Sequence, residues 1–554
     1  MLRFTEFRIA VPSVLACCGL VATGPASAQT LPERTLSSDA ARSVLANAPA
    51  ALKTISAADL ESFAKTLASD AFGGRLTGTP GQVKAAQLFA SQFEKLGLQP
   101  LGDANEKDER GWFQAYDVRF ERLVSDATGL FDTQGTKLNH HGAWFVPGRK
   151  PRQYGTEGQL VFSHGKRTRD LDLTDKIAVI PFKIRPDRPG GNVYRAMSIG
   201  MNLLAVVRSH ANRARRAGAA GCVLVSPEFT GSFLSATNMF GVFPGKPRVT
   251  RTSRGARAMM LGGAGTSIPT LVVTGNDANK VFAALGLTAE EAFDPSSDDT
   301  HGRTSKLTYK LTAKRVIEPG QAVNTCGFLE GTDPDLKKQA IVYSCHMDHL
   351  GHAADGGFFY GADDNASGSS SVLEIAEAYA GLAAGERPKR SVIFLAVSGE
   401  ELGLWGSDHF VNHPTWDLDR IVANINMDML GRSTRKVPAD CISVTPSYRH
   451  RNYSTLARDA AFLGRALGLE MKNGDRFYTR SDHYNFAKKG IPVVFFADDE
   501  HEDYHMPTDT WDKLEYPKME RIARLAFLIG LRAANANKAP QSLGRRAGWF
   551  AEAK

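Results

Sequence analysis

The chain has 554 residues, of which 42% are hydrophobic, so it holds enough apolar material for two or three cores and is too long for a single one. Lys and Arg total 67 against 59 Asp and Glu, which leaves a modest formal charge of +8. From the length we expect two domains. Basic residues are scattered apart from the short cluster Arg213, Arg215 and Arg216, so we expect no nucleic-acid partner.

The amino terminus has the pattern of a secretory leader. Arg3 and Arg8 supply positive charge, residues 9–21 are apolar, and Ala26-Ser27-Ala28 forms a small-residue cleavage site. The pattern predicts a signal peptide and export to the periplasm or the medium. The apolar stretch is too short to span a bilayer, and no later window approaches ~20 apolar residues, so we expect no transmembrane segment.

Two features of the cysteines leave alternatives open. Residues 14–17 resemble a lipoprotein box, which would make Cys17 an acylated anchor as an alternative to the later cleavage. Beyond the leader the cysteines are Cys222, Cys326, Cys345 and Cys441. Cys326 and Cys345 would either pair across neighbouring strands or remain buried free thiols, because the sequence does not fix the strand register.

The first folded part predicts helices, and the next predicts short strands. Residues 57–98 are predicted to be helical, with a glycine-rich interruption at 72–81 and one apolar face over 83–98. From about 120 to 312 we expect a separate α+β or β-rich module inserted into the main fold. Its predicted elements are strands at 159–163, 176–182, 221–226 and 269–273 and a helix at 201–217.

Four short apolar runs in the last part of the chain each lead to a carboxylate or a histidine. The runs at 340–344, 391–397, 421–425 and 491–496 precede His346, Glu400 with Glu401, Asp428, and His505. Their length and β-branched content predict buried strands of a parallel or mixed sheet. Ligands of such sheets bind at the carboxyl ends of the strands, and this mixture of donors suits a borderline divalent metal such as zinc.

Two pairs of acidic residues in this section support a metal site. Asp363 and Asp364 open a predicted helix, where capping is the ordinary explanation, but beside His346 and Glu401 we expect Asp364 to bind metal. The pair Glu400-Glu401 ends an apolar strand, a poor place for two charges without a function. One glutamate can hold an ion while the other takes a proton.

Together these motifs resemble the secreted zinc aminopeptidases with two co-catalytic metals, whose superfamily includes glutamate carboxypeptidase and glutaminyl cyclase. The resemblance covers roughly residues 67–100 and 316–536. It rests on Asp348 two positions after His346 and on the motifs at 361–368, 398–403, 426–428, 481–483 and 504–510. The loop at 74–79 is similar to the amino-terminal segment of this family, and residues 217–221 resemble part of a protease-associated domain.

The resemblance implies the zinc exopeptidase fold, an α/β fold with a mixed, largely parallel central sheet and helices on both faces. It implies a smaller protease-associated-like insert. The division is a signal peptide at 1–28, the first part of the peptidase domain at 29–119, the insert at 120–312, the zinc peptidase domain at 313–540 and a tail at 541–554.

The resemblance also implies roles for matched residues. Asp364 would bridge two Zn²⁺ ions, with Co²⁺ or Mn²⁺ as substitutes. The remaining ligands would be His346 and Asp428 for one ion, and Glu401 and His505 for the other. Asp348 would orient His346, and Glu400 would be the general base.

Some roles stay open in this resemblance. Tyr504 is the candidate oxyanion donor, with Tyr478 as the alternative. The family pattern implies a cis peptide after Asp364. We expect structural or supporting roles for His349, His352 and His483, because five ligands are already assigned.

We therefore expect an aminopeptidase that acts on peptides with a free amino terminus. The alternatives are a glutaminyl cyclase-like acyl transferase, a carboxypeptidase or dipeptidase of the same fold, and a receptor-like binding ectodomain whose site has decayed, as in the transferrin receptor. The complete ligand set and Glu400 favour the aminopeptidase. Neither the preferred amino-terminal residue nor the oligomeric state follows from the sequence.

Overall fold

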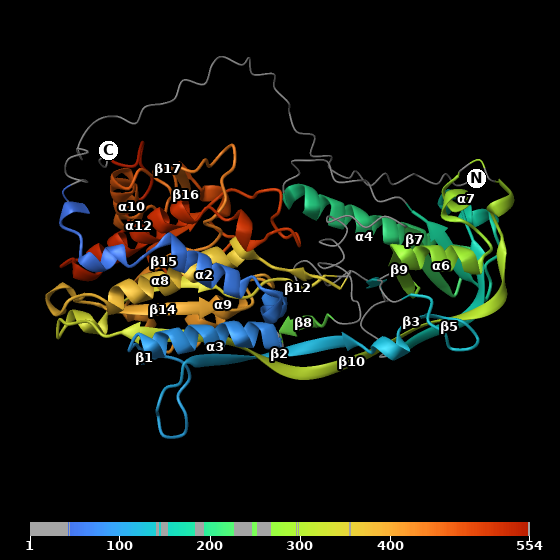
Figure 1. The fold of residues 1–554 in the computed structure, drawn as a ribbon, viewed down its shortest axis with the longest axis horizontal. Coiled ribbons are helices and arrows are strands. Elements are labelled where there is room, and N and C mark those ends of the chain that lie inside the picture. The colour runs from blue at the N-terminus through green and yellow to red at the C-terminus, as the bar shows by residue number, and fades with distance from the viewer. Residues whose placement is uncertain are drawn as a thin grey trace, which may run out of the picture. The chain divides into compact units, whose positions relative to one another are not determined.

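The computed structural model describes residues 43 and 45–551, apart from gaps at 140–142, 146–152, 183–192, 227–245, 252–267, 295, 297 and 354–355 (Figure 1). The predicted signal peptide and the lipoprotein cysteine lie outside the described residues. No helix among the described residues is long and apolar enough to cross a membrane.

The central sheet of the carboxyl-terminal part has the strand order β17-β16-β18-β15-β11-β14-β10. Its strands are β10 (Thr304–Leu329), β11 (Ala340–His346), β14 (Ser391–Val397), β15 (Ile421–Met427), β16 (Cys441–Thr445), β17 (Glu470–Asn473) and β18 (Val493–Ala497). The four strands from β18 to β14 are parallel, while β10 and β16 run antiparallel to their neighbours β14 and β18. The predicted mixed, largely parallel α/β sheet is confirmed.

Burial explains why the predicted runs form central strands. Every residue of β11 and of β14 is buried, which fits strands that are covered on both faces. Two of the predicted strands extend further than their apolar runs: β11 continues to His346 and β15 continues to Met427. The strands therefore deliver polar residues directly to the carboxyl edge of the sheet.

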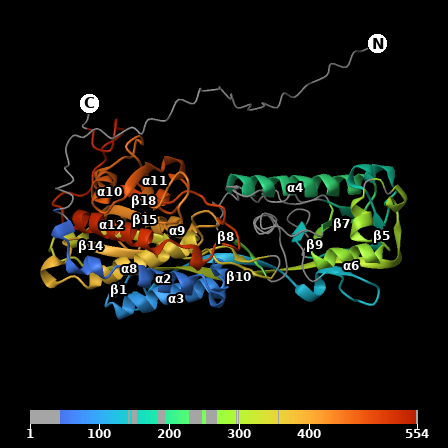
Figure 2. The same cartoon turned by 45° about the horizontal axis from the view of Figure 1, so that its top comes forward.

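Helices cover both faces of this sheet (Figures 1 and 2). They are α2 (Ala57–Leu67), α3 (Pro80–Lys95), α8 (Gly368–Ala380), α9 (Trp405–Asn412), α10 (Thr455–Ala466), α11 (His483–Lys488) and α12 (Tyr516–Asn535). On one face Tyr379 of α8 packs against Tyr343 and Phe394, with ring centroids 5.8 Å away in each case. On the other face Phe410 of α9 and Phe486 of α11 join one buried cluster with alternate residues of β11 and β14.

The amino-terminal helices belong to the same packing. The predicted helix over 83–98 is α3, which begins at Pro80 and ends at Lys95. Its buried Phe93 lies 6.1 Å from Phe394 of β14, measured between ring centroids. The glycine-rich interruption forms a short 3₁₀ segment (Asp70–Arg75) and a turn before α3. The apolar face of this helix therefore packs on the later sheet.

Residues between Phe113 and Thr312 supply most of the remaining strands. They are β2 (Phe113–Leu123), β3 (Gly129–Phe131), β4 (Ala143–Phe145), β5 (Gln153–Phe162), β6 (Ile177–Pro181), β7 (Gly221–Ser226), β8 (Arg248–Arg251) and β9 (Thr270–Thr274), with helices α4 (Val193–Arg216), α6 (Asn276–Ala284) and α7 (Ala289–Phe293). The short strands β1 (Gln99–Pro100), β12 (Gly351–His352) and β13 (Phe358–Phe359) complete the set.

The strands predicted for the insert are present, and the predicted helix is longer than expected. β5, β6, β7 and β9 form a parallel group with two buried hydrophobic clusters of their own. The helix predicted over 201–217 is α4, which already begins at Val193. β10 connects the two strand groups, because residues 304–314 pair with β3 or β5 and residues 315–329 pair with β2 or β14.

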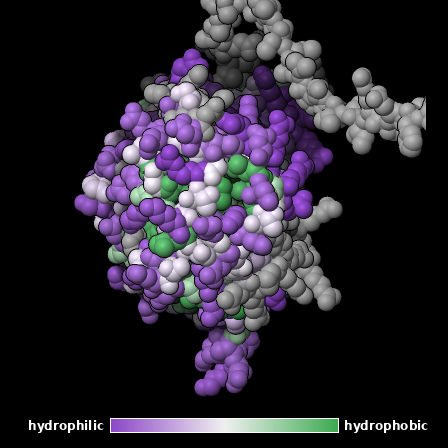
Figure 3. All heavy atoms as spheres, turned by 90° about the vertical axis from the view of Figure 1, so that its right-hand side faces the viewer, coloured by the Kyte–Doolittle hydropathy of each residue, from purple (hydrophilic) through white to green (hydrophobic). Residues whose placement is uncertain are grey.

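The cysteines and the surface complete the description. Cys222, Cys326, Cys345 and Cys441 are all buried free thiols. Cys326 and Cys345 lie on β10 and β11, which β14 separates, so they do not form the disulfide that the sequence left open. The face in Figure 3 carries mostly hydrophilic side chains, with small hydrophobic groups between them, as is usual for a surface in contact with water.

Candidate metal centre

Three strands bring candidate ligands to one edge of the central sheet. His346 ends β11, Asp428 directly follows β15, and Glu401 lies four residues after β14. The parallel register aligns His346 with Val397, the last residue of β14. Because parallel strands end on the same side, the predicted residues come together at the carboxyl edge.

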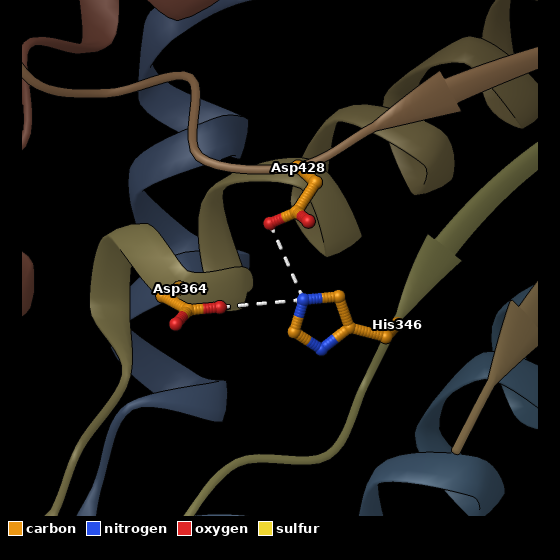
Figure 4. Close-up of side chains that lie close together, drawn as sticks. All are labelled: His346, Asp364 and Asp428. Atoms are coloured by element: carbon orange, nitrogen blue, oxygen red, sulfur yellow. Dashed lines mark hydrogen bonds and ion pairs between the residues drawn. The ribbon is translucent and has the colours of Figure 1, made fainter. Parts of the chain in front are cut away.

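The first group consists of His346, Asp364 and Asp428 (Figure 4). His346 Nε2 lies 3.2 Å from Asp428 Oδ1 and 3.3 Å from Asp364 Oδ1. Figure 4 shows both carboxylates pointing toward the same ring nitrogen. All three side chains are buried, so the group is a compact set of one nitrogen and two oxygen donors.

The second group shares Asp364 with the first. His505 Nε2 lies 3.0 Å from Asp364 Oδ2 and 3.0 Å from Glu401 Oε2. Asp364 therefore turns one oxygen toward His346 and the other toward His505. This arrangement is the one expected of a carboxylate that bridges two ions.

The loop that carries Asp364 is held by other parts of the chain. Asp509 accepts hydrogen bonds from the backbone N–H groups of Asp363 and Asp364. Buried Arg75 donates hydrogen bonds to the carbonyl oxygens of Tyr360 and Gly361 just before this loop. The peptide bond from Asp364 to Asn365 is cis, as the family resemblance implied.

A chain of hydrogen bonds through Ser481 and Asn426 fixes Asp428. Ser481 Oγ donates to Asp428 Oδ2 at 2.7 Å, and Asn426 Nδ2 donates to Ser481 Oγ at 2.8 Å. Ser344 of β11 in turn donates to Asn426 Oδ1 at 2.6 Å. The fixed oxygen leaves Asp428 Oδ1 directed at His346, in the way that partners of metal-binding carboxylates usually act.

Asp348 supports both His346 and Glu400. Asp348 Oδ1 lies 3.8 Å from His346 Nδ1, while the carbonyl oxygen of Asp348 is closer, at 3.2 Å. The same Oδ1 accepts a hydrogen bond of 3.3 Å from the backbone N–H of Glu400. The nearer contact to His346 is therefore made by the backbone of Asp348, while its carboxylate holds the turn that carries Glu400.

The buried charges of the second group shift the pKa values of Glu401 and His505 in opposite directions. Burial and Asp364 raise the pKa of Glu401, but His505 and His349 outweigh them and lower it to about 2. Burial lowers the pKa of His505, but Glu401 and Asp364 raise it to about 10. The carboxylate of Glu401 is therefore held in its ionised form, which is the form that binds metal.

In contrast to Glu401, Asp428 of the first group and the candidate base Glu400 have raised pKa values. Burial raises the pKa of Asp428, and His346 reverses only part of that effect. Burial also raises the pKa of Glu400 well above its usual range, with further contributions from Glu401 and Asp428. Several carboxylates therefore share a site with few compensating cations, which a divalent metal would supply.

The donor set fits zinc. His505 Nε2 is buried and has no hydrogen bond of acceptable geometry, although two carboxylate oxygens lie 3.0 Å away. Such separations between donors are typical of ligands arranged around one ion with bonds of about 2 Å. One histidine with two carboxylates at each position matches the nitrogen and oxygen donors that borderline metals prefer.

The two candidate tyrosines differ in their surroundings. The Tyr504 ring stacks on His505 with centroids 3.9 Å apart. Burial, Asp364 and Glu401 raise the pKa of Tyr504 well above its usual range, so its hydroxyl keeps its proton. The Tyr478 hydroxyl accepts a hydrogen bond from Asn452, and its ring packs on His450. The stacking on His505 places the Tyr504 ring beside the second group of donors.

The three histidines left without ligand roles lie in different places. His483 is buried and stacks on Phe495. His352 lies on β12 and packs on Phe358. His349 is buried against the second group, with Nδ1 only 2.6 Å from Glu401 Oε1. The position of His349 directly after Asp348 could have indicated a place near the site, but no local pattern indicates Glu401 as its partner.

Comparisons with known proteins agree with this site. The model of peptidase family M28 matches residues 324–529. Aminopeptidase YwaD of Bacillus subtilis is 28% identical over 223 residues, which are 38% of this chain and 45% of that protein. A probable leucine aminopeptidase of Trichophyton verrucosum is 26% identical over 198 residues, which are 35% of this chain and 53% of that protein. The chain spans about half the length of these curated relatives.

A solved structure gives a weaker likeness over more of the chain. It is BSAP, a zinc aminopeptidase from Bacillus subtilis, with 20% sequence identity and a TM-score of 0.48. The match covers 88% of this chain and 97% of that one. The family match itself begins in β10 and ends in α12, so it includes the sheet edge that carries His346, Asp364, Glu401, Asp428 and His505. Residues 324–529, which carry the candidate ligands, are thus similar to peptidase family M28.

Proposed function

We propose that the protein is an exported metallo-exopeptidase, an aminopeptidase that removes residues from peptides with a free amino terminus. The observation that carries this proposal is the division of Asp364: Oδ1 lies 3.3 Å from His346 and Oδ2 lies 3.0 Å from His505. Two sets of donors that share one carboxylate support a site for two Zn²⁺ ions. His346 and Asp428 would complete one site, and Glu401 and His505 the other.

Zinc at these positions would polarise the scissile carbonyl group and lower the pKa of water toward neutrality. The side chains of the chain supply the other parts of the reaction. Glu400 lies beside both groups and is part-exposed, so it can take a proton from the attacking water and return it to the leaving amine. Tyr504, which keeps its proton, can donate a hydrogen bond to the carbonyl oxygen as negative charge develops there.

Export and the inserted domain are parts of the same proposal. The leader pattern at 1–28 supports export, and sequencing the amino terminus of the mature protein tests it, because cleavage after Ala28 leaves Gln29 first. Two buried clusters formed by β5, β6, β7 and β9 support an inserted domain over about 120–312. We propose that this domain is protease-associated-like.

Hydrolysis of matched substrates tests the activity. The mature protein is assayed with a panel of aminoacyl nitroanilides and with the N-acetylated form of the best one, each with and without chelator. We expect release from the free-amine substrates only and loss of that release with chelator. Release from the acetylated substrate contradicts an aminopeptidase. Cyclisation of amino-terminal glutamine without nitroanilide release would instead favour a glutaminyl cyclase-like acyl transferase.

A further inference from the structure

His349 is held rigidly beside the second group of donors. It follows β11 by three residues, and its side chain is fully buried. Its backbone N–H donates a hydrogen bond of 3.1 Å to the carbonyl oxygen of Arg75. Gly361, in the loop that leads to Asp364, lies against the imidazole, since a Cβ atom on Gly361 would come within 2.5 Å of the ring. The ring therefore has little freedom to turn.

The ring nitrogen of His349 faces a single oxygen of Glu401. His349 Nδ1 lies 2.6 Å from Glu401 Oε1 and 3.9 Å from Asp364 Oδ2. The other oxygen, Glu401 Oε2, lies 3.0 Å from His505 Nε2. The two oxygens of Glu401 thus have different neighbours: one meets His349, and the other meets His505 and the shared carboxylate.

Distance separates a hydrogen-bond partner from a metal ligand. Two donors that bind one zinc ion at about 2.0 to 2.2 Å in a tetrahedral arrangement lie roughly 3.3 Å from each other. The separations of His505 from its two carboxylate oxygens, 3.0 Å each, are close to that value. The 2.6 Å between His349 and Glu401 is shorter and is typical of a charge-assisted hydrogen bond.

The chemistry of the pair then fixes the proton. An ionised carboxylate only accepts hydrogen bonds. In this contact Nδ1 of His349 therefore carries the proton and donates a hydrogen bond to Glu401 Oε1. A carboxylate oxygen engaged in this way is less available to an ion. Glu401 would therefore approach the metal through Oε2 alone.

We propose that His349 is a positioning residue for the zinc site formed by Asp364, Glu401 and His505, and that it makes Glu401 a ligand through one oxygen. The inference rests on the proposed function, since it concerns the second of the two sites. Each site would then have its own partner for a carboxylate ligand: Ser481 for Asp428 at the first site, and His349 for Glu401 at the second. Partners of this kind commonly change metal affinity by about 10- to 100-fold.

Zinc titration of the metal-stripped full chain tests the inference. Wild type, His349→Ala, His349→Asn and His352→Ala are compared by competition with a chelator of known affinity. Asn is the conservative variant because its amide nitrogen occupies the place of Nδ1 and can donate the same hydrogen bond. His352 is the matched control, since it lies near His349 on β12, is exposed and packs on Phe358.

We expect His349→Ala to weaken one zinc equivalent by about 10- to 100-fold, to leave the other unchanged, and to be largely rescued in His349→Asn. Absorption of the Co²⁺-loaded protein should change in the Ala variant and return in the Asn variant. Unchanged titration of His349→Ala overturns the inference. Complete loss of one equivalent without rescue by Asn also overturns it, because His349 would then be a direct ligand.

The wild-type titration keeps this inference distinct from the proposed function. A wild type that binds a single equivalent contradicts the two-ion proposal. In that case the affinity of the single site still decides the role of His349, because it either depends on the Nδ1 donor or does not. If His349→Ala does not fold, the comparison of His349→Asn with wild type remains: near wild-type affinity supports the inference, and loss of the site overturns it.

Discussion

Thr77 Oγ1 donates a hydrogen bond of 2.7 Å to Asp348 Oδ2, although 271 residues separate the two in the chain. Both side chains are fully buried. The second oxygen of Asp348 holds the backbone of Glu400, so a single carboxylate connects the early glycine-rich loop with the turn that carries Glu400.

Thr77→Val should destabilise the protein by about 1 to 3 kcal/mol, because it leaves a buried carboxylate oxygen without its donor. Thr77→Ser keeps the hydroxyl group and should lose much less. Chemical denaturation of the two variants and wild type measures the difference. Equal stability of the Val and Ser variants would show that the hydrogen bond does not support the fold.

Glu400→Gln should keep the bound metal and lower kcat by ~10² to 10⁴, the usual contribution of a general base. The amide has the shape of the carboxylate but cannot take the proton. Metal analysis and steady-state kinetics on the same preparation measure both effects. Turnover equal to that of wild type would remove Glu400 from the mechanism.

Asp364→Ala should lose metal and activity together, because both groups of donors share this carboxylate. The comparison variant is Asp363→Ala, whose carboxylate accepts a hydrogen bond from the backbone N–H of Gly431 but is not one of the metal donors. Asp363→Ala should reduce stability more than metal content. Retention of two ions in Asp364→Ala would reject the bridge.

Tyr504→Phe should lower kcat by ~10² to 10³ with a smaller effect on KM, because the hydroxyl group is expected to act on charge that develops in the transition state. Tyr478→Phe is the matched control, since the Tyr478 hydroxyl is engaged by Asn452. A larger loss of kcat in Tyr478→Phe than in Tyr504→Phe would exchange the two assignments.

Glu374 on α8 should make the fold less stable as pH rises. Burial raises its pKa to about 8, and the hydrogen bond from the Ser56 N–H offsets only part of this shift. Below pH ~4 the folded and unfolded states both hold the proton. Between there and pH 8 the unfolded state releases it while the folded state retains it, so the stability of the folded state falls over that window.

Glu374→Gln removes this titration, and it should raise stability relative to wild type by about 1 to 3 kcal/mol at pH 8, with little difference at pH 4. The exposed Glu377 on the same helix provides the control, Glu377→Gln, which should show no such trend. Denaturation midpoints of the two variants and wild type, measured from pH 4 to pH 8, test this prediction. A stability difference between Glu374→Gln and wild type that does not change with pH would contradict the assignment.

Local patterns predicted the central strands and most of the polar residues at their ends. The runs that became β11, β14 and β15 are apolar and β-branched because both faces of the sheet are covered, and this leaves a clear signal. The apolar runs did not predict the strand ends, because the pairing of β11 and β15 with their neighbours continues into His346 and Met427, which lie beyond the runs. A strand ends where pairing ends rather than where hydrophobicity ends.

The supporting contacts were beyond local patterns. Asp509 binds the backbone of Asp363, 146 residues away, and His349 meets Glu401 across 52 residues. Both contacts depend on tertiary packing and side-chain rotamers, which the hydrophobic periodicity of the sequence does not predict. Asp348 was expected to contact only His346. Its hydrogen bond from the backbone of Glu400 depends on how the turn after β14 folds, which the sequence pattern does not show.

Metal content of the mature protein, measured by elemental analysis beside Asp364→Ala, tests the central claim most directly. The shared carboxylate predicts about two zinc ions per wild-type chain and far fewer in the variant. One zinc ion per wild-type chain, or two ions retained by Asp364→Ala, would contradict a site in which Asp364 joins two ions.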